Sequence, residues 1–250
     1  MNIDSQTYAC RPRLLQDRVI LITGASDGIG KALAICAAEL AAQVILHGRN
    51  SQKVEAVHDE IVQLGTACVP SIAVMDLATA DSDAYVSLAD SIQQKFGRLD
   101  GLVHNAGILG QRLSIEQYDA AEWQRVLHVN LTAPFALTQV LLPLLKKSQD
   151  ASMIFTSSGV GREGRAFWGA YSVSKFGTEA LSQILAAENK HVPIRVNCVN
   201  PGPTRTRMRL QAYPGEDRNA SKPPGEVLSP YLYLLGPDSR NVTGQSLDAQ

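Results

Sequence analysis

The chain has 250 residues, of which 45% are hydrophobic and 19% are charged, as in an ordinary globular protein. Its 23 lysines and arginines against 24 aspartates and glutamates give a net charge of −1, which argues against nucleic-acid binding by a basic surface. The length fits one α/β domain, and no uninterrupted apolar stretch approaches the roughly 20 residues of a membrane span.

The cysteines and the N-terminus indicate the cellular compartment of the protein. Cys10, Cys36, Cys68 and Cys198 form no Cys-x-x-Cys pair and have no metal-ligand spacing. They are therefore expected to be reduced, as is typical of the cytosol. Residues 1–17 are polar and lack the apolar core of a signal peptide. We expect a cytoplasmic protein without a metal site and without a membrane partner.

The first predicted strand, 19–22, leads into a glycine-rich turn and then into a predicted helix over 29–42. The turn has the spacing Gly24-x3-Gly28-x-Gly30. Strand, glycine turn and helix are the context in which a dinucleotide binds, because glycines admit the pyrophosphate and the helix N-terminus supplies amide donors. The spacing differs from the common Gly-x-Gly-x-x-Gly, and a glycine turn without a ligand is the alternative.

Strands and helices alternate along the rest of the chain. The other predicted strands are 43–47, 67–74, 99–104, 152–156, 194–199 and 242–247, and the other predicted helices are 51–64, 83–96, 123–146 and 170–189. Ser51 is expected to cap the helix that it begins, and Gly65 and Gly97 to end helices. Repeated strand–helix units predict a parallel sheet covered on both faces, with ligands at the carboxyl ends of its strands.

Two segments lack this alternation. Residues 1–16 are expected to form a surface arm. Residues 203–226 contain four prolines and many charges, and a loop this long is usually functional or disordered. A solvated insertion is the alternative.

Tyr171, Lys175 and Ser158 are the candidate catalytic residues. Tyr171 and Lys175 are four residues apart, so their side chains project from one face of the predicted helix. A free tyrosine has a pKa near ~10, and a neighbouring cation favours the phenolate and lowers that pKa. A serine hydroxyl could bind the oxygen on which charge changes. A solvated helix face is the alternative for the pair taken alone.

Taken together, these motifs resemble those of the short-chain dehydrogenase/reductase superfamily, classical branch, over nearly the whole chain. Within it the chain looks most like the bacterial YciK-type oxidoreductases. The motifs are Thr23-Gly24-x3-Gly28-x-Gly30, Asn105-Ala106-Gly107, Asn130, Ser158 with Tyr171 and Lys175, and Asn200-Pro201-Gly202-Pro203-Thr204. The resemblance implies a single Rossmann-type domain over residues 1–250, with a doubly wound parallel sheet of about seven strands.

The resemblance also implies the site. Tyr171 is the expected general acid/base, Lys175 lowers its pKa and binds the nicotinamide ribose, Ser158 holds the substrate carbonyl, and Asn130 holds a water in a proton relay. A helix amide bonded to neighbouring backbone is the alternative for Asn130. The expected cofactor-binding residues are Gly24, Ser26, Asp27, Gly28, Ile29, Gly30, Arg49, Asp76, Leu77, Asn105, Ala106, Gly107, Tyr171, Lys175, Pro201, Gly202 and Thr204.

Cofactor choice is predicted from the end of the second strand. NAD-specific relatives tend to have an acidic residue there, and none occurs from 43 to 53. Arg49 offers a guanidinium that can bind a 2′-phosphate. We expect a preference for NADP(H), with NAD(H) possible.

The predicted function is therefore an NADP(H)-dependent oxidoreductase that interconverts a carbonyl and a secondary alcohol. The implied partners are a small-molecule substrate and further copies of the chain, in a homodimer or homotetramer. Segment 203–226 is implied to be a mobile substrate flap. Five arginines near its mouth, Arg162, Arg165, Arg205, Arg207 and Arg209, suggest an anionic or polar substrate, and a charged solvated rim explains them equally. The alternatives are a non-catalytic nucleotide-binding scaffold and a sugar-nucleotide epimerase or dehydratase.

Overall fold

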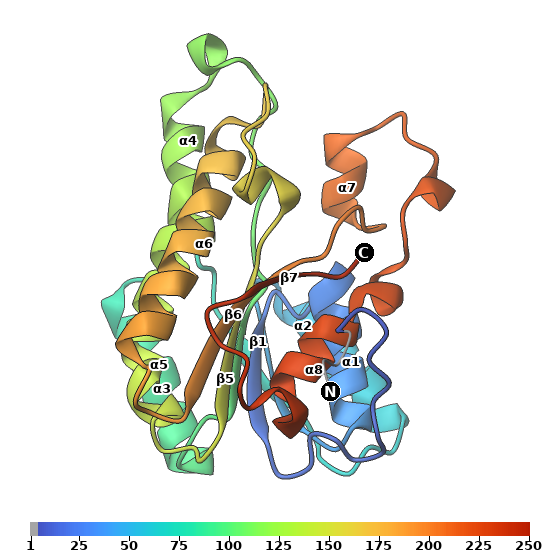
Figure 1. Ribbon diagram of the computed structural model, residues 1–250, viewed down its shortest axis with the longest axis vertical. Helices are drawn as coiled ribbons and strands as arrows, with labels where there is room; N and C mark the ends of the chain where they lie inside the picture. Colours follow the sequence, from blue (N-terminus) through green and yellow to red (C-terminus); the bar gives the residue numbers. More distant parts are fainter. Residues whose placement is uncertain (1–4) are drawn as a thin grey trace.

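The structure is a computed structural model that describes residues 5–250. Seven parallel strands form one sheet in the order β3-β2-β1-β4-β5-β6-β7 (Figure 1). In chain order they are β1 (Val19–Thr23), β2 (Gln43–Gly48), β3 (Ser71–Val74), β4 (Gly101–His104), β5 (Ala151–Thr156), β6 (Ile194–Asn200) and β7 (Ser246–Asp248). The first four residues of the predicted arm lie outside the described residues.

Helices cover both faces of this sheet, which confirms the predicted doubly wound fold. They are α1 (Gly28–Glu39), α2 (Ser51–Gln63), α3 (Ser82–Phe96), α4 (Ala120–Leu127), α5 (Ala133–Leu145), α6 (Gly169–Glu188), α7 (Arg207–Ala212) and α8 (Ser229–Leu235). Helices α1, α2 and α8 lie on one face, and α3, α5 and α6 on the other (Figure 1).

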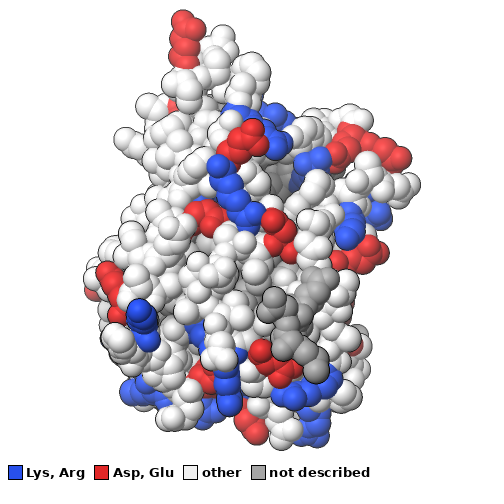
Figure 2. All heavy atoms as spheres, in the orientation of Figure 1, with Lys and Arg blue, Asp and Glu red and all other residues white. Residues whose placement is uncertain are grey.

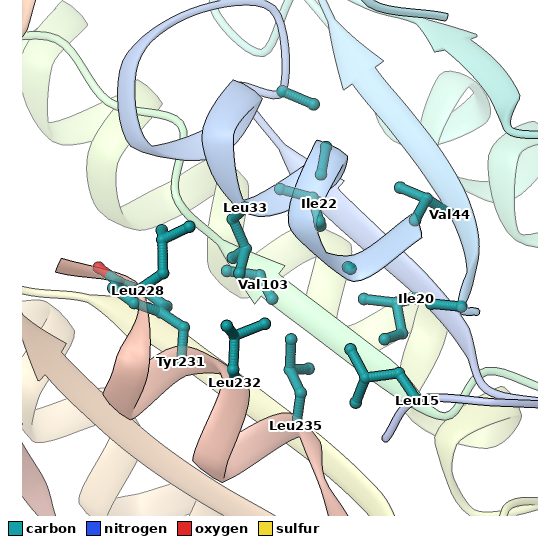
Figure 3. Packing of buried hydrophobic residues seen from close by; sticks show 14 of the residues in the cluster. Leu15, Ile20, Ile22, Leu33, Val44, Val103, Leu228, Tyr231, Leu232 and Leu235 are labelled. Carbon is teal, nitrogen blue, oxygen red and sulfur yellow. The ribbon is translucent and has the colours of Figure 1, made fainter. Parts of the chain in front are cut away.

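Each face has its own apolar core, because successive side chains of a strand point to opposite faces. Ile20 and Ile22 of β1 pack with Leu33 of α1 and Leu232 of α8 (Figure 3). Leu21, between them, belongs to the core beneath α3, α5 and α6. Burial on both faces explains why β1 is a continuous apolar run.

Some predicted boundaries are wrong. Asn50, not Ser51, caps α2, since its Oδ1 accepts from the backbone N of Lys53 at 3.0 Å. Strand β3 begins only at Ser71, the first residue paired with β2, and β7 lies later than predicted. The predicted helix ends at Gly65 and Gly97 are confirmed, because these glycines have the left-handed φ values of 65° and 75°.

The predicted helix over 123–146 is interrupted. A π-helical turn, His128–Thr132, joins α4 to α5. The continuous run Ala120–Leu145 is long and apolar enough to pass for a membrane span by length and composition. Its residues Leu137 and Leu141 lie fully buried in the core, which accounts for this apolar composition.

Residues 203–226, called the flap below, contain short helices between loops. They contain α7, whose N-cap Thr206 accepts from the backbone N of Arg209 at 3.2 Å. A β-bridge between Thr204 and Lys222 closes the base of the flap. A helix of six residues has too short an apolar period to be predicted from the sequence.

Candidate active site

The predicted site residues gather at the carboxyl edge of the sheet. The segments that follow β1, β4, β5 and β6 all leave the sheet there, and α6 begins beside them. This edge of an open parallel sheet is where ligands bind.

Tyr171 and Lys175 are both buried on α6. Tyr171 is hydrogen-bonded to the side chain of Ser158, which follows β5. The Nζ of Lys175 donates to the carbonyl of Thr156 at 2.6 Å and lies 5.7 Å from the centroid of the Tyr171 ring. The fold therefore brings together the three residues that the sequence grouped.

Burial, rather than the neighbouring lysine, controls the acidity of Tyr171. It raises the pKa of Tyr171 to about 12, and the hydrogen bond with Ser158 acts in the opposite direction. Burial also lowers the pKa of Lys175 to about 8. The predicted lowering of the Tyr171 pKa is therefore not found in this structure, because desolvation disfavours the phenolate. At neutral pH, Tyr171 is a protonated acid.

Asn130 lies in the π-helical turn, a feature frequent at functional sites. Its Oδ1 accepts from the backbone N of Ile108 at 2.8 Å. Its Nδ2 donates to the carbonyl of Ile108 at 2.9 Å and to Oγ of Ser174 at 3.1 Å. The amide thus ties the loop after β4 to α6, two segments far apart in the sequence.

The glycine turn, called the glycine cradle below, has no room for side chains at Gly24 and Gly30, because neighbouring protein atoms lie too close. Gly24 and Gly28 have φ of 68° and 55°, which favours glycine. A Cβ on Gly30 would lie 2.3 Å from the carbonyl oxygen of Gly24. Asp27 caps α1 by accepting from the backbone N of Gly28 at 2.8 Å. Ile29 packs against the core beneath the turn. A glycine turn at a helix N-terminus fits the pyrophosphate of a dinucleotide.

Thr23 joins this turn to the segment after β4. Its Oγ1 accepts from the backbone N of Asn105 and of Ala106, each at 3.0 Å. Asn105 in turn donates from Nδ2 to the carbonyl of Thr23 at 3.0 Å. A Cβ on Gly107 would lie 3.3 Å from Oδ1 of Asn130, so the chain passes close to Asn130. Thr23 belongs to the glycine motif of the sequence, but it is not among the expected site residues.

The ends of β2 and β3 form the other side of the cradle. Arg49 is exposed and forms no ion pair with residues 5–250. Ser26 lies against Gly48, where a Cβ would be 3.4 Å from its Oγ. Asp76 holds the turn after β3, since its Oδ1 accepts from the backbone N of Ala78 at 3.0 Å. The next residue, Leu77, is buried in the core.

The loop after β6 contains one further candidate. Thr204 is buried and donates to the carbonyl of Gly202 at 3.1 Å, within its own loop. Gln250 covers the same loop, donating to the carbonyl of Pro201 at 2.6 Å. Thr206 packs instead on the glycine turn, because a Cβ on Gly28 would lie 3.1 Å from its methyl carbon. Thr206 precedes the apolar positions of α7, as a helix cap does. This sequence signal could have identified Thr206 as a site residue.

The arginines predicted near the mouth are mostly paired. Arg162 donates to Asp248 at 2.8 Å, and Arg207 lies 3.5 Å from Asp27. Arg209 clamps Glu216 through two guanidinium nitrogens. Figure 2 shows positive and negative side chains interspersed on this face of the molecule. The predicted arginines are therefore largely neutralised by the protein itself.

His104, at the end of β4, makes structural contacts in the core. Its Nε2 lies 2.9 Å from Oγ1 of Thr138, and its ring stacks on Phe155 with 4.7 Å between centroids. Burial lowers the pKa of His104 to about 3, so the ring is neutral.

Comparisons with known proteins agree with this geometry. The family model described as short chain dehydrogenase matches residues 18–217. The chain is 48% identical to the uncharacterized oxidoreductase YciK of Escherichia coli, over 97% of this chain and 96% of that protein. It is 32% identical to a 3-oxoacyl-(acyl-carrier-protein) reductase of Thermotoga maritima, over 92% of this chain and 95% of that protein.

Two solved structures are similar over almost their whole length. The structure of yciK from E. coli has a TM-score of 0.95 and 48% identity, covering 98% of this chain and 99% of that chain. A short chain dehydrogenase from Shigella flexneri, solved in complex with NADP, has a TM-score of 0.94 and 48% identity, covering 96% of this chain and 100% of that chain.

Proposed function

The chain belongs to the short chain dehydrogenase family of oxidoreductases, and from this premise we propose that it interconverts a carbonyl and a secondary alcohol with NADP(H). The observation that carries the proposal is the grouping of three side chains: Ser158 acts on the buried phenol of Tyr171, and Lys175 lies one helical turn away, with Nζ 5.7 Å from the Tyr171 ring centroid. This group lies at the edge of the sheet that also holds the glycine cradle.

Tyr171 is proposed to move the proton. Its raised pKa keeps the phenol protonated at neutral pH, the form that can donate to a developing alkoxide. Ser158, already bonded to Tyr171, would bind the same oxygen and stabilise its charge. The bound nicotinamide supplies or accepts the hydride, and the protein orients it.

Lys175 and Asn130 support that proton transfer. Lys175 would contact the nicotinamide ribose and place a positive charge beside the phenol, which favours the phenolate when the alcohol is oxidised. The carbonyl of Asn130, in the π-helical turn, would hold a water that connects Lys175 to solvent. The side chain of Asn130 is engaged with Ile108 and Ser174, so it fixes the position of that turn.

NADP(H) is the proposed cofactor for two reasons. Arg49 is exposed and unpaired among residues 5–250, at the end of β2 where the adenosine ribose binds in this fold. A similar short chain dehydrogenase was solved with NADP and another with NADPH. Ser26, Asp76 and Leu77 would complete the adenosine site, and Asn105, Ala106 and Gly107 the ribose site. Pro201, Gly202 and Thr204 would contact the nicotinamide end, as would Thr206.

The same proposal includes the oligomeric state of the enzyme and its location in the cell. Exposed apolar side chains lie on α5 and α6, namely Phe135, Val173, Phe176 and Ile184. A homodimer or homotetramer formed through these helices would cover them. We place the enzyme in the cytoplasm.

The test is a screen of aldehydes, ketones and oxo acids for oxidation of NADPH. Turnover that saturates with a carbonyl compound and disappears in Tyr171→Phe supports the proposal. NADPH binding without turnover of any compound would instead favour a nucleotide-binding scaffold.

A further inference from the structure

Arg112, in the loop that follows β4, stacks on Trp168, the residue whose ring lies next to that of Tyr171. Its guanidinium carbon is 4.5 Å from the centroid of the Trp168 ring and 4.9 Å from that of Tyr213. The Trp168 ring is in turn 5.7 Å from that of Tyr171. One indole therefore separates this guanidinium from the phenol, and no pattern in the sequence pointed to Arg112.

One edge of the Arg112 guanidinium is not paired with any of the described residues 5–250. Its Nη1 donates to the carbonyl of Ala212 in the flap. Its Nε is buried without a hydrogen-bond partner, and Arg112 forms no ion pair with any carboxylate of the described residues 5–250.

Other arginines of this protein show what that edge binds. Arg125 clamps Glu122 through Nε and Nη2, at 2.7 and 2.8 Å. Arg209 clamps Glu216 through the same two nitrogens. A carboxylate is planar and matches this edge with two parallel hydrogen bonds.

No carboxylate of residues 5–250 forms an ion pair with Arg112. Arg209 stacks on the same flap ring as Arg112, with its guanidinium carbon 4.0 Å from the Tyr213 ring centroid, but Glu216 already neutralises Arg209. A half-buried cation beside aromatic and apolar groups is costly unless an anion joins it. The vacant edge thus favours a ligand with a negative charge.

We propose that the substrate carries a carboxylate, which the Nε–Nη2 edge of Arg112 binds while the carbonyl lies at Tyr171. This proposal rests on the proposed function and specifies its substrate class as oxo acids and their hydroxy-acid products. Ala212 and Tyr213 belong to the flap, so the carboxylate reaches the buried Nε when the flap moves and is covered when it returns.

The test compares acids with their neutral esters. The probes are 2-oxobutanoate, 3-oxobutanoate and 4-oxopentanoate, each beside its methyl ester, with NADPH as reductant. For the preferred acid, wild type should have kcat/KM at least ~10-fold above that of the ester. Arg112→Gln should reduce kcat/KM for the acid by roughly 10- to 150-fold, mainly through KM, and change that for the ester less than about 3-fold.

Matched variants separate recognition of the carboxylate from packing of the Arg112 side chain. Arg112→Met keeps the apolar stem between the rings and should behave as Arg112→Gln. Arg112→Lys keeps the charge without the planar fork and should lose less. Arg11→Gln is the control, since Arg11 is exposed and lies 3.5 Å from the carboxylate of Asp238. Equal wild-type rates on acid and ester, or equal losses on both in Arg112→Met, would overturn the proposal.

A binding measurement makes the result independent of turnover. Trp123 and Trp168 are the two tryptophans of the chain, so Trp123→Phe leaves Trp168 as the reporter stacked on Arg112. With NADP⁺ bound, 3-oxobutanoate should change this fluorescence saturably, and Arg112→Gln should abolish the change. Identical titrations in the two proteins would reject a role for Arg112. Absence of turnover on every probe counts against the proposed function alone, because the titration still decides on Arg112.

Discussion

At the residue scale, the phenol of Tyr171 is the group on which the proposed chemistry depends. It is buried, bonded to Ser158 and kept protonated by desolvation. The structure thus assigns it a different resting state from the one predicted, in which a lysine lowers its pKa. A protonated phenol suits carbonyl reduction, while oxidation of the alcohol requires the charge of Lys175 to offset the desolvation.

Replacing Tyr171 by phenylalanine should stop turnover and preserve the cofactor site. Tyr171→Phe keeps the ring and removes the transferable proton, so kcat should fall at least ~10²-fold while NADPH affinity changes little. Steady-state kinetics and NADPH titration measure the two effects. Tyr233→Phe, in the core on α8, is the matched control. Full turnover by Tyr171→Phe on any accepted carbonyl would refute the role of Tyr171.

Arg49 should determine cofactor choice. Arg49→Ala should weaken NADPH binding by the ~1.5–3 kcal/mol of a charged hydrogen bond, roughly 10- to 150-fold, and leave NADH binding almost unchanged. Titration of both reduced cofactors measures this difference. Lys146→Ala removes an exposed cation at the end of α5 and should alter neither affinity. If wild type binds NADH as tightly as NADPH, the NADP preference is wrong.

At the element scale, an exposed ion pair and the contacts of Arg112 link the flap to the rest of the chain. The ion pair between Arg207 and Asp27 links it to the glycine turn, but both side chains are more than half exposed. Exposed ion pairs contribute little to stability. The contacts of Arg112 with Ala212 and Tyr213 hold its other side. A segment held in this way is suited to open for a ligand and close over it.

Cofactor binding should therefore protect the flap. Peptides from residues 203–226 should exchange amide hydrogens more slowly when NADPH is bound, because Thr204 and Thr206 lie beside the proposed cofactor site. Hydrogen-exchange mass spectrometry with and without NADPH measures this protection. Helix α8, Ser229–Leu235, is buried in the core and serves as the internal control. An equal exchange rate of the flap in both states would indicate a passive loop.

At the scale of the whole molecule, two buried histidines link stability to pH. Burial lowers the pKa of His47 to about 4 and that of His104 to about 3. In the unfolded chain both titrate near ~6.5, so the unfolded state binds more protons below that pH. Their contribution to stability is thus complete above pH ~6.5 and is lost as the pH falls toward the folded-state values.

Acid should destabilise the protein in this window, and removing one histidine should reduce the effect. Between about pH 6 and 4.5, each histidine should contribute a slope near ~1.4 kcal/mol per pH unit to the free energy of unfolding. His104→Asn should decrease the total slope by about that amount in urea titrations at several pH values. His191→Asn, at an exposed position, is the control. An unchanged slope in His104→Asn would contradict the neutral state of His104.

The sequence by itself determined the order of elements and the local geometry of the motifs. Apolar runs such as β1 specify buried strands, glycines specify the turn after it, and a spacing of four places Tyr171 and Lys175 on one helix face. These features depend on residues close together in the chain, so their periodicity and steric limits suffice to predict them.

Only the tertiary structure decided what depends on contacts between distant segments. Asn130 is fixed by Ile108 and Ser174, and Arg112 lies between rings from two other loops. The pKa of Tyr171 follows from how completely the folded chain excludes water, which the sequence alone does not specify. Desolvation and side-chain contact are properties of the packed chain, and for that reason the vacant edge of Arg112 became visible only in the fold.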